Sequence, residues 1–76
     1  MEYENRLKDL REDEDKYQQE VANDLNIHQT TLSKYELGTI DIPTKLLIKF
    51  ADYYRTSTDY ILKRTNEKRP YKEVKK

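Results

Sequence analysis

The sequence predicts an all-α domain of five short helices around one core. Its apolar residues recur three and four positions apart, which is the spacing of a buried helix face. Asn26, Gly38 and Pro43, residues typical of turns and helix ends, separate the apolar groups. A chain of 76 residues gives one small domain, and domains of this size bury only about 60% of the surface that the unfolded chain exposes. We therefore expect a single folded domain of modest stability, with no second, ligand-sensing domain.

Composition narrows the class of protein further. The chain has no cysteine, so it can form neither a disulfide nor a thiolate metal site, and this fits a reducing cytoplasm. The longest apolar run, residues 46–48, is far shorter than the ~20 residues that span a bilayer. No signal peptide is recognisable ahead of the domain. We expect a soluble cytoplasmic protein that has no membrane partner.

The net charge is zero, but the charges are unevenly distributed along the chain. Residues 1–15 hold three basic and seven acidic side chains, a net charge of −4. Residues 63–76 hold seven basic and two acidic side chains, a net charge of +5. The zero average argues against a polycation that coats nucleic acid, while the distribution predicts a molecule that is basic at one end.

The first helix is predicted from Tyr3, Leu7 and Leu10, whose spacing forms one buried stripe. Residues 12–15 follow as an acidic link, and their carboxylates precede the positive end of the next helix dipole. A catalytic pair of carboxylates is the alternative interpretation of this cluster. We disfavour it because no histidine, lysine base or pocket-forming sequence accompanies the carboxylates.

The next two helices are predicted over residues 18–25 and 28–37, joined by a single turn. Ala22 is small enough for the point where two helices cross steeply, and Asn26 tolerates the positive φ that the turn needs. Apolar residues occupy the positions where both helices face the domain. These residues are Val21, Leu25, Ile27, Leu32 and Tyr35. The pattern is that of a helix-turn-helix.

Two further helices complete the domain. Gly38 is expected in a left-handed cap after the third helix, and Pro43 in the first turn of the fourth. Thr56 and Ser57 can cap the fifth helix, which has Asp59 in its first turn. The residues expected to face inward from these two helices are Leu46, Leu47, Phe50, Ala51, Tyr54, Ile61 and Leu62. Residues 67–76 lack periodicity and are expected to form a flexible basic tail.

The helix-turn-helix region resembles the Cro and phage-repressor type helix-turn-helix family, and the similarity extends over residues 3–65. The matching residues are Tyr17, Gln18, Val21, Ala22, Leu25, Asn26, Ile27, His28, Leu32, Ser33, Lys34, Tyr35, Glu36 and Gly38. The resemblance implies a five-helix lambda-repressor-like DNA-binding domain over residues 1–66. The chain departs from the family pattern at four positions. They are Lys16, Tyr17, Asn26 and Ile40, where relatives carry an apolar residue, a Thr or Ser cap, a glycine and a basic residue.

The resemblance implies a DNA-binding surface on the third helix. Placing Leu32 and Tyr35 inward turns Thr30, Ser33 and Lys34 outward, with Gln29 at the N-terminal edge. Gln29, Thr30 and Lys34 would contact base edges in the major groove, assisted by Ser33. Four other residues would contact the DNA backbone. They are Gln18 at the start of the second helix, His28, Thr39 and Lys45.

The expected function is therefore that of a sequence-specific transcriptional regulator, by family habit a repressor, that binds double-stranded DNA as a homodimer. The alternative is a protein-interaction or antitoxin-like module that keeps the same fold.

We expect no enzyme, since no nucleophile has a base at a recognisable spacing, and no cofactor or small-molecule effector. His28 alone cannot form a zinc site, so it is a capping and phosphate-contacting residue or is merely exposed. The seven tyrosines invite one other interpretation, a stacking platform for single strands, but most lie in helical patterns typical of packing.

Overall fold

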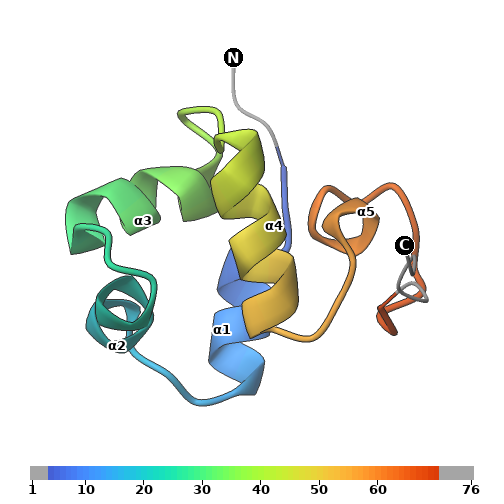
Figure 1. Cartoon of the computed structure of the whole chain (residues 1–76), viewed down its shortest axis with the longest axis horizontal. Coiled ribbons are helices and arrows are strands. Elements are labelled where there is room, and N and C mark those ends of the chain that lie inside the picture. Colours follow the sequence, from blue (N-terminus) through green and yellow to red (C-terminus); the bar gives the residue numbers. More distant parts are fainter. Residues whose placement is uncertain (1–3, 71–76) are drawn as a thin grey trace, which may run out of the picture.

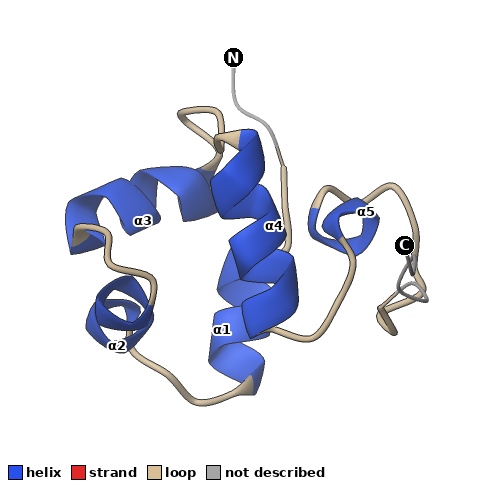
Figure 2. Ribbon diagram, in the orientation of Figure 1, coloured by secondary structure: helices blue, strands red, loops and turns tan. Residues whose placement is uncertain are grey.

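The computed structural model describes residues 4–70, and in this range the chain forms five helices and no strand (Figure 2). The helices are α1 (Leu7–Asp13), α2 (Gln18–Asp24), α3 (Gln29–Leu37), α4 (Thr44–Tyr53) and α5 (Thr58–Ile61). Figure 1 shows α1 and α4 in the centre, α2 and α3 on one side of them and α5 on the other. The all-α prediction with five helices is confirmed.

Every helix contributes one of the large, fully buried side chains of the core. These side chains are Leu7, Val21, Leu32, Phe50 and Ile61, each 0% exposed. Burying a side chain of this kind stabilises the fold by about 1.5 to 3 kcal/mol relative to leaving it in water. Tyr35 adds an edge-to-face contact with Phe50, with 6.2 Å between ring centroids. The five helices therefore share a single core.

The turn between α2 and α3 has the predicted construction. Asn26 takes the left-handed conformation with φ 57°, and the Ile27 amide donates to the Ala22 carbonyl at 2.9 Å. Ala22 is 0% exposed, as expected for the small residue at a helix crossing. In Figure 1, α2 is seen almost along its axis while α3 lies across the picture, which shows the steep crossing of the two helices.

The predicted helix ends are confirmed at Gly38 and Ser57 and wrong at Pro43 and Thr56. Gly38 has φ 74° after α3, and the Ser57 hydroxyl accepts a hydrogen bond from the Tyr60 amide at 3.0 Å. Pro43 is the N-cap of α4, one residue before the first turn. The buried Thr56 hydroxyl instead donates to the Lys68 carbonyl at 2.6 Å, so it ties the following segment to the domain.

Two other expectations need correction. The first two residues of the predicted acidic link, Glu12 and Asp13, belong to α1, because that helix continues to Asp13. Leu62 does not pack inward: α5 is a single turn that ends at Ile61, so Leu62 lies past the buried stripe and is 42% exposed. Leu7 and Leu10 are buried as predicted, whereas Tyr3 lies outside the described residues.

Most of the described tyrosines are packing residues, which disfavours the stacking platform. Tyr35 and Tyr54 are 7% and 3% exposed, and Tyr53 packs edge-to-face on Tyr54 with 5.0 Å between centroids. Lys16, where the family resemblance implies an apolar residue, donates from its ammonium group to the Tyr53 hydroxyl at 2.8 Å. The ammonium group also lies 4.6 Å from the centre of the Tyr53 ring, which is a cation–π contact.

Candidate nucleic-acid interface

Helix α3 separates a buried face from an exposed polar face, as the sequence predicts. Leu32 is 0% exposed and Tyr35 7% exposed, so this side of the helix fills the core. Gln29, Thr30 and Lys34 are exposed on the other side. Ser33 is half-buried and offers less of its surface. The exposed face of α3 thus presents a short polar row of amide, hydroxyl and ammonium groups, from Gln29 at its start to Lys34 in its last turn.

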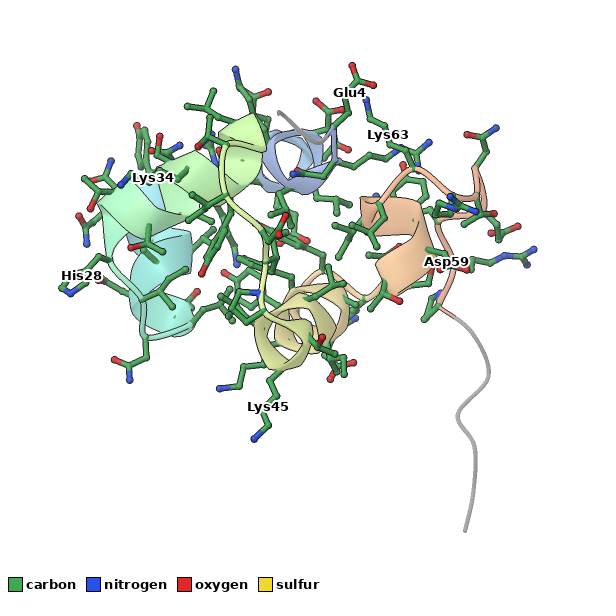
Figure 3. The ribbon with its side chains drawn as sticks, turned by 90° about the horizontal axis from the view of Figure 1, so that it is seen from above. Glu4, His28, Lys34, Lys45, Asp59 and Lys63 are labelled. Carbon is green, nitrogen blue, oxygen red and sulfur yellow. The ribbon has the colours of Figure 1, made fainter. Side chains whose placement is uncertain are left out.

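His28 stands at the N-cap of α3 with an extended backbone, φ −75° and ψ 145°. Its side chain is exposed and makes no capping hydrogen bond, so the capping role considered from the sequence is wrong. Figure 3 shows His28 pointing away from the body of the domain at the corner between α2 and α3. The imidazole is free to contact a ligand that approaches the polar row.

Gln18, the first residue of α2, is held in place by two other side chains. Its side-chain amide donates to a Glu36 carboxylate oxygen at 3.0 Å and accepts from the Gln29 amide at 3.3 Å. The structure therefore brings Gln18 and Gln29 together, although they lie 11 residues apart. A glutamine amide has two N–H groups, so one N–H of Gln18 is left over for another acceptor.

Glu36 joins α3 to α1 through a bidentate ion pair that the sequence analysis missed. The Arg11 guanidinium donates to the two carboxylate oxygens of Glu36 at 2.8 and 3.1 Å. The side chains of Arg11 and Glu36 are only 12% and 2% exposed. The hydrogen bonds that Arg11 donates to Glu36 raise the pKa of Arg11, because they favour the charged guanidinium. A separation of 25 residues leaves no local sequence pattern that could reveal this pair.

The start of α2 compensates for the lost Thr or Ser cap. The Tyr17 side chain cannot cap the helix, but the Glu20 carboxylate accepts from the Tyr17 amide at 3.0 Å. This is the backward half of a capping box. Tyr17, the residue before Gln18, is 78% exposed.

The two remaining predicted site residues lie beyond the C-terminal end of α3. Thr39 is exposed, and its hydroxyl donates to the Lys34 carbonyl at 3.3 Å. Lys45 is exposed on the first turn of α4, and Figure 3 shows its side chain pointing outward. Thr39 follows α3 and Lys45 lies on α4, so both residues belong to other segments than the Gln18–Gln29 pair.

An apolar pocket of about 340 Å³ lies beside the loop between α3 and α4. Gly38, Ile40, Asp41 and Ile42 form its loop side, and its other lining residues are Glu4, Asn5, Leu47 and Leu62. Ile40 and Leu62 are 39% and 42% exposed, so the pocket opens to the surface.

Two kinds of site are absent from residues 4–70. In this range no three or more histidine, cysteine, aspartate or glutamate side chains are grouped so that they could hold a metal ion. None of the helices described is both long enough and apolar enough to cross a membrane.

Comparison with known proteins gives a match over the region just described. Residues 7–61 match the helix-turn-helix family. The chain is 42% identical over 57 residues to the HTH-type transcriptional regulator ImmR of Bacillus subtilis (strain 168). The aligned residues cover 75% of this chain and 45% of that protein. This chain thus spans less than half the length of that relative. No solved structure matches this chain significantly. The chain belongs to the helix-turn-helix family, in the Cro and phage-repressor type that its sequence resembles.

Proposed function

We propose that this chain is a sequence-specific transcriptional regulator that binds double-stranded DNA and reads the major groove with α3. The observation that carries the proposal is the two-sided character of this helix. Leu32 and Tyr35 bury one side, while Gln29, Thr30 and Lys34 stay exposed on the other. The major groove of DNA admits a helix and presents donors, acceptors and thymine methyl groups that these side chains can contact.

The proposed contacts fall into two groups. Gln29, Thr30 and Lys34 contact base edges, with Ser33 assisting from its half-buried position. Gln18, His28, Thr39 and Lys45 contact phosphates and so fix the position of α3 in the groove. The exposure of His28, Thr39 and Lys45 and the spare N–H of Gln18 support these backbone roles.

The similarity to a transcriptional regulator supports the biological role. The relative is named as an HTH-type transcriptional regulator, and we propose the same activity here, as a repressor in the cytoplasm. The family is one of DNA-binding regulators, and we propose that this chain is not an enzyme and uses no cofactor, metal or small-molecule effector. We also propose that residues 1–66 form the DNA-binding domain.

A homodimer is the proposed active form. Two copies related by a two-fold axis bind two inverted half-sites whose centres lie about 10 to 10.5 base pairs, or a multiple of this spacing, apart. The pocket beside the α3–α4 loop, with exposed Ile40 and Leu62, offers an apolar surface for the second copy. A single asymmetric half-site bound by one chain at saturation would contradict the dimer.

The alternative function is a protein-interaction or antitoxin-like module, and the same pocket favours it. Ile40 occupies the position where relatives carry a basic residue, and the net charge of the chain is zero. A partner protein would cover the apolar pocket, whereas DNA would cover the polar row of α3.

Selection of bound duplexes from a random pool, followed by a salt titration, separates the two functions. We expect a palindromic consensus and an affinity that falls steeply as salt rises, because phosphate contacts release counterions. Lys45→Gln should lower the slope of log affinity against log salt by about 0.9, the value for one lost phosphate contact on duplex DNA. Lys63→Gln is the matched control, since Lys63 lies near α5 and away from His28 and Lys45 in Figure 3. Absence of any duplex preference would contradict the proposed function.

We propose that residues 67–76 act as a basic tail that attracts phosphate without reading sequence. Residues 71–76 lie outside the described residues, and Lys68 holds the Thr56 hydroxyl through its carbonyl group. Replacing Lys72, Lys75 and Lys76 with glutamine keeps that contact while removing charge. Affinity for all duplexes should then fall by a similar factor, with a shallower salt slope. A change confined to the dimer's dissociation constant would contradict this role.

A further inference from the structure

The segment after α5, residues 62–68, is tied to the domain at its far end, and we call it the strap. The Thr56 hydroxyl, between α4 and α5, donates to the Lys68 carbonyl at 2.6 Å. Thr56 is only 4% exposed, and a buried hydroxyl that loses its partner destabilises the fold. Valine has a methyl group in place of this hydroxyl and would need no partner. Threonine at this position therefore favours a strap that stays bound at Lys68.

Arg6 holds the near end of the strap on both sides of Leu62. The Arg6 amide donates to the Ile61 carbonyl at 2.9 Å. Its guanidinium donates to the Tyr60 carbonyl at 2.6 Å and, beyond Leu62, to the Thr65 carbonyl at 2.7 Å. The guanidinium also lies 4.1 Å from the centre of the Tyr60 ring, which is a cation–π contact. A single residue thus fixes the loop that carries Leu62 from both directions.

Arg6 also connects Leu62 to another part of the apolar pocket. Glu4 and Asn5, directly before Arg6, line the pocket together with Leu62. Asn5 is held in turn by α3, because its side chain donates to the Tyr35 carbonyl at 2.8 Å. The position of Leu62 relative to the Glu4–Asn5 part of the pocket therefore depends on Arg6.

We propose that Thr56 and Arg6 are positioning residues that, through the strap, set Leu62 for contact with a second copy of this chain. The inference rests on the homodimer proposed above and names the segment that controls it. Leu62 is 42% exposed, so its side chain is available as an apolar anchor. An anchor that is fixed before binding loses less conformational freedom on binding, which increases affinity. The tie at Lys68 acts on the same loop, because Thr65 lies between it and Leu62.

The experiment compares changes at Thr56 by sedimentation equilibrium of the 76-residue chain. Thr56→Val removes the hydroxyl that holds Lys68, so it should raise the dimer's dissociation constant roughly 2- to 10-fold, the range for one hydrogen bond. Thr56→Ser keeps the hydroxyl and removes a buried methyl group, so it should lower the melting temperature and leave the dissociation constant unchanged. Thr58→Val is the matched control, because it makes the same exchange at a half-buried position of α5, outside the strap, and should change neither quantity.

The two Thr56 variants separate a positioning role from a merely structural one. With a structural role, the dissociation constant would follow the melting temperature, and Thr56→Ser would weaken the dimer more than Thr56→Val. That result, or a dissociation constant of Thr56→Val equal to the wild-type value, would overturn the inference and leave the homodimer standing. The affinity of a single chain for one half-site needs no second copy and should be the same in all these proteins.

Arg6→Gln tests the near end of the strap. Glutamine has two N–H donors where arginine has five, so it cannot replace all the contacts of the guanidinium. The dimer's dissociation constant should rise at least as much as in Thr56→Val, to about 10-fold above the wild type. An Arg6→Gln chain that folds and dimerises like the wild type would overturn the inference. If this variant fails to fold, the Thr56 variants still decide.

Limited trypsin cleavage of the free protein keeps the two possible failures apart. Trypsin cuts the peptide bond at the Lys68 carbonyl, which the Thr56 hydroxyl holds. Cleavage after Lys68 should therefore be several-fold faster in Thr56→Val than in the wild type or in Thr58→Val. Equal rates in the three proteins would overturn the inference even if a dimer forms. A wild type that stays monomeric, with the cleavage rates as expected, would overturn the proposed homodimer together with the role assigned to Leu62.

Discussion

The two ends of α3 are held in different ways. At the C-terminal end, Glu36 pairs with Arg11 of α1, and the Tyr35 carbonyl accepts from the Asn5 side chain at 2.8 Å. At the N-terminal end, the His28 side chain makes no capping hydrogen bond, and the exposed Gln29 side chain donates to the half-buried Gln18 side chain at 3.3 Å. One end is fixed by buried, charged hydrogen bonds, while the other projects polar groups outward.

This difference allows a small domain to hold α3 rigidly while the side chains on its exposed face remain open to change. The anchored end fixes the direction of the whole helix, so the free end needs no stabilising contacts of its own. Substitutions at Gln29 or Lys34 can then change what is recognised without changing the fold. Substitutions at Arg11 should do the reverse.

The largest effect on folding is expected for Arg11→Ala. This change leaves Glu36 charged, 2% exposed and without its cation. Breaking a buried ion pair from one side typically costs 3 to 5 kcal/mol, and we expect about 3 because Gln18 still donates to Glu36. Denaturant unfolding measures the loss, and a loss below about 0.5 kcal/mol would show that the pair does not anchor α3.

A smaller loss is expected for Ala22→Leu at the crossing of α2 and α3. Ala22 is fully buried there, and overpacking a filled core typically costs about 1 to 3 kcal/mol. Asn23→Leu adds the same side chain at the next, exposed position and should change the free energy of unfolding by no more than about 0.5 kcal/mol. Equal effects of the two changes on the melting curve would show that the crossing has spare room.

Tyr54 provides a prediction about pH near the anchored end. Its hydroxyl is buried and has no hydrogen-bond partner within the part of the chain that the structure describes. Burial raises the pKa of Tyr54 above its ordinary value of 10.0. Because the folded pKa is the higher one, this contribution to stability is complete below pH 10.0 and is lost as pH rises toward the folded pKa.

Tyr54→Phe removes both the unpartnered hydroxyl and its titration. At neutral pH we expect the variant to be as stable as the wild type or up to about 1 kcal/mol more stable. Above pH 10.0 the wild type should lose stability faster than the variant. Parallel loss of stability in both proteins, measured by denaturant unfolding from pH 8 to 11, would show that Tyr54 is not the group responsible.

The smallest effect on folding is expected on the exposed face of α3. Gln29→Ala and Lys34→Ala should leave the free energy of unfolding within about 0.5 kcal/mol of the wild type. Each should reduce specific relative to non-specific binding by roughly 1 to 3 kcal/mol for a lost base contact. Titration of a selected and a scrambled duplex measures this difference. Full retention of sequence preference in both variants would contradict the proposed orientation of α3.

The sequence predicted local features well because each depends on neighbouring residues. The turn at Asn26, the cap at Gly38 and the buried positions Leu32 and Tyr35 follow from backbone preference and helical period alone. The exposed face of α3 followed from the same period, as the exposure of Gln29, Thr30 and Lys34 shows.

The features that the sequence did not reveal depend on tertiary contacts. The Arg11–Glu36 pair and the Asn5–Tyr35 hydrogen bond join residues 25 and 30 positions apart. Leu62 was predicted to be buried because the period continues through it, but α5 ends one residue earlier and leaves it exposed. Where a one-turn helix ends depends on what packs against it, and periodicity does not contain that information.

The central claim, that the free end of α3 is where DNA binds, can be tested by ¹⁵N NMR during titration with the selected duplex. We predict the largest backbone amide shifts at residues 28–31, with further shifts at Gln18, Thr39 and Lys45. Lys63, which lies near α5 and away from His28 and Lys45 in Figure 3, should shift little at a stoichiometry of one chain per half-site. Shifts concentrated at Ile40, Ile42 and Leu62 around the apolar pocket, with residues 28–31 unchanged, would contradict the claim.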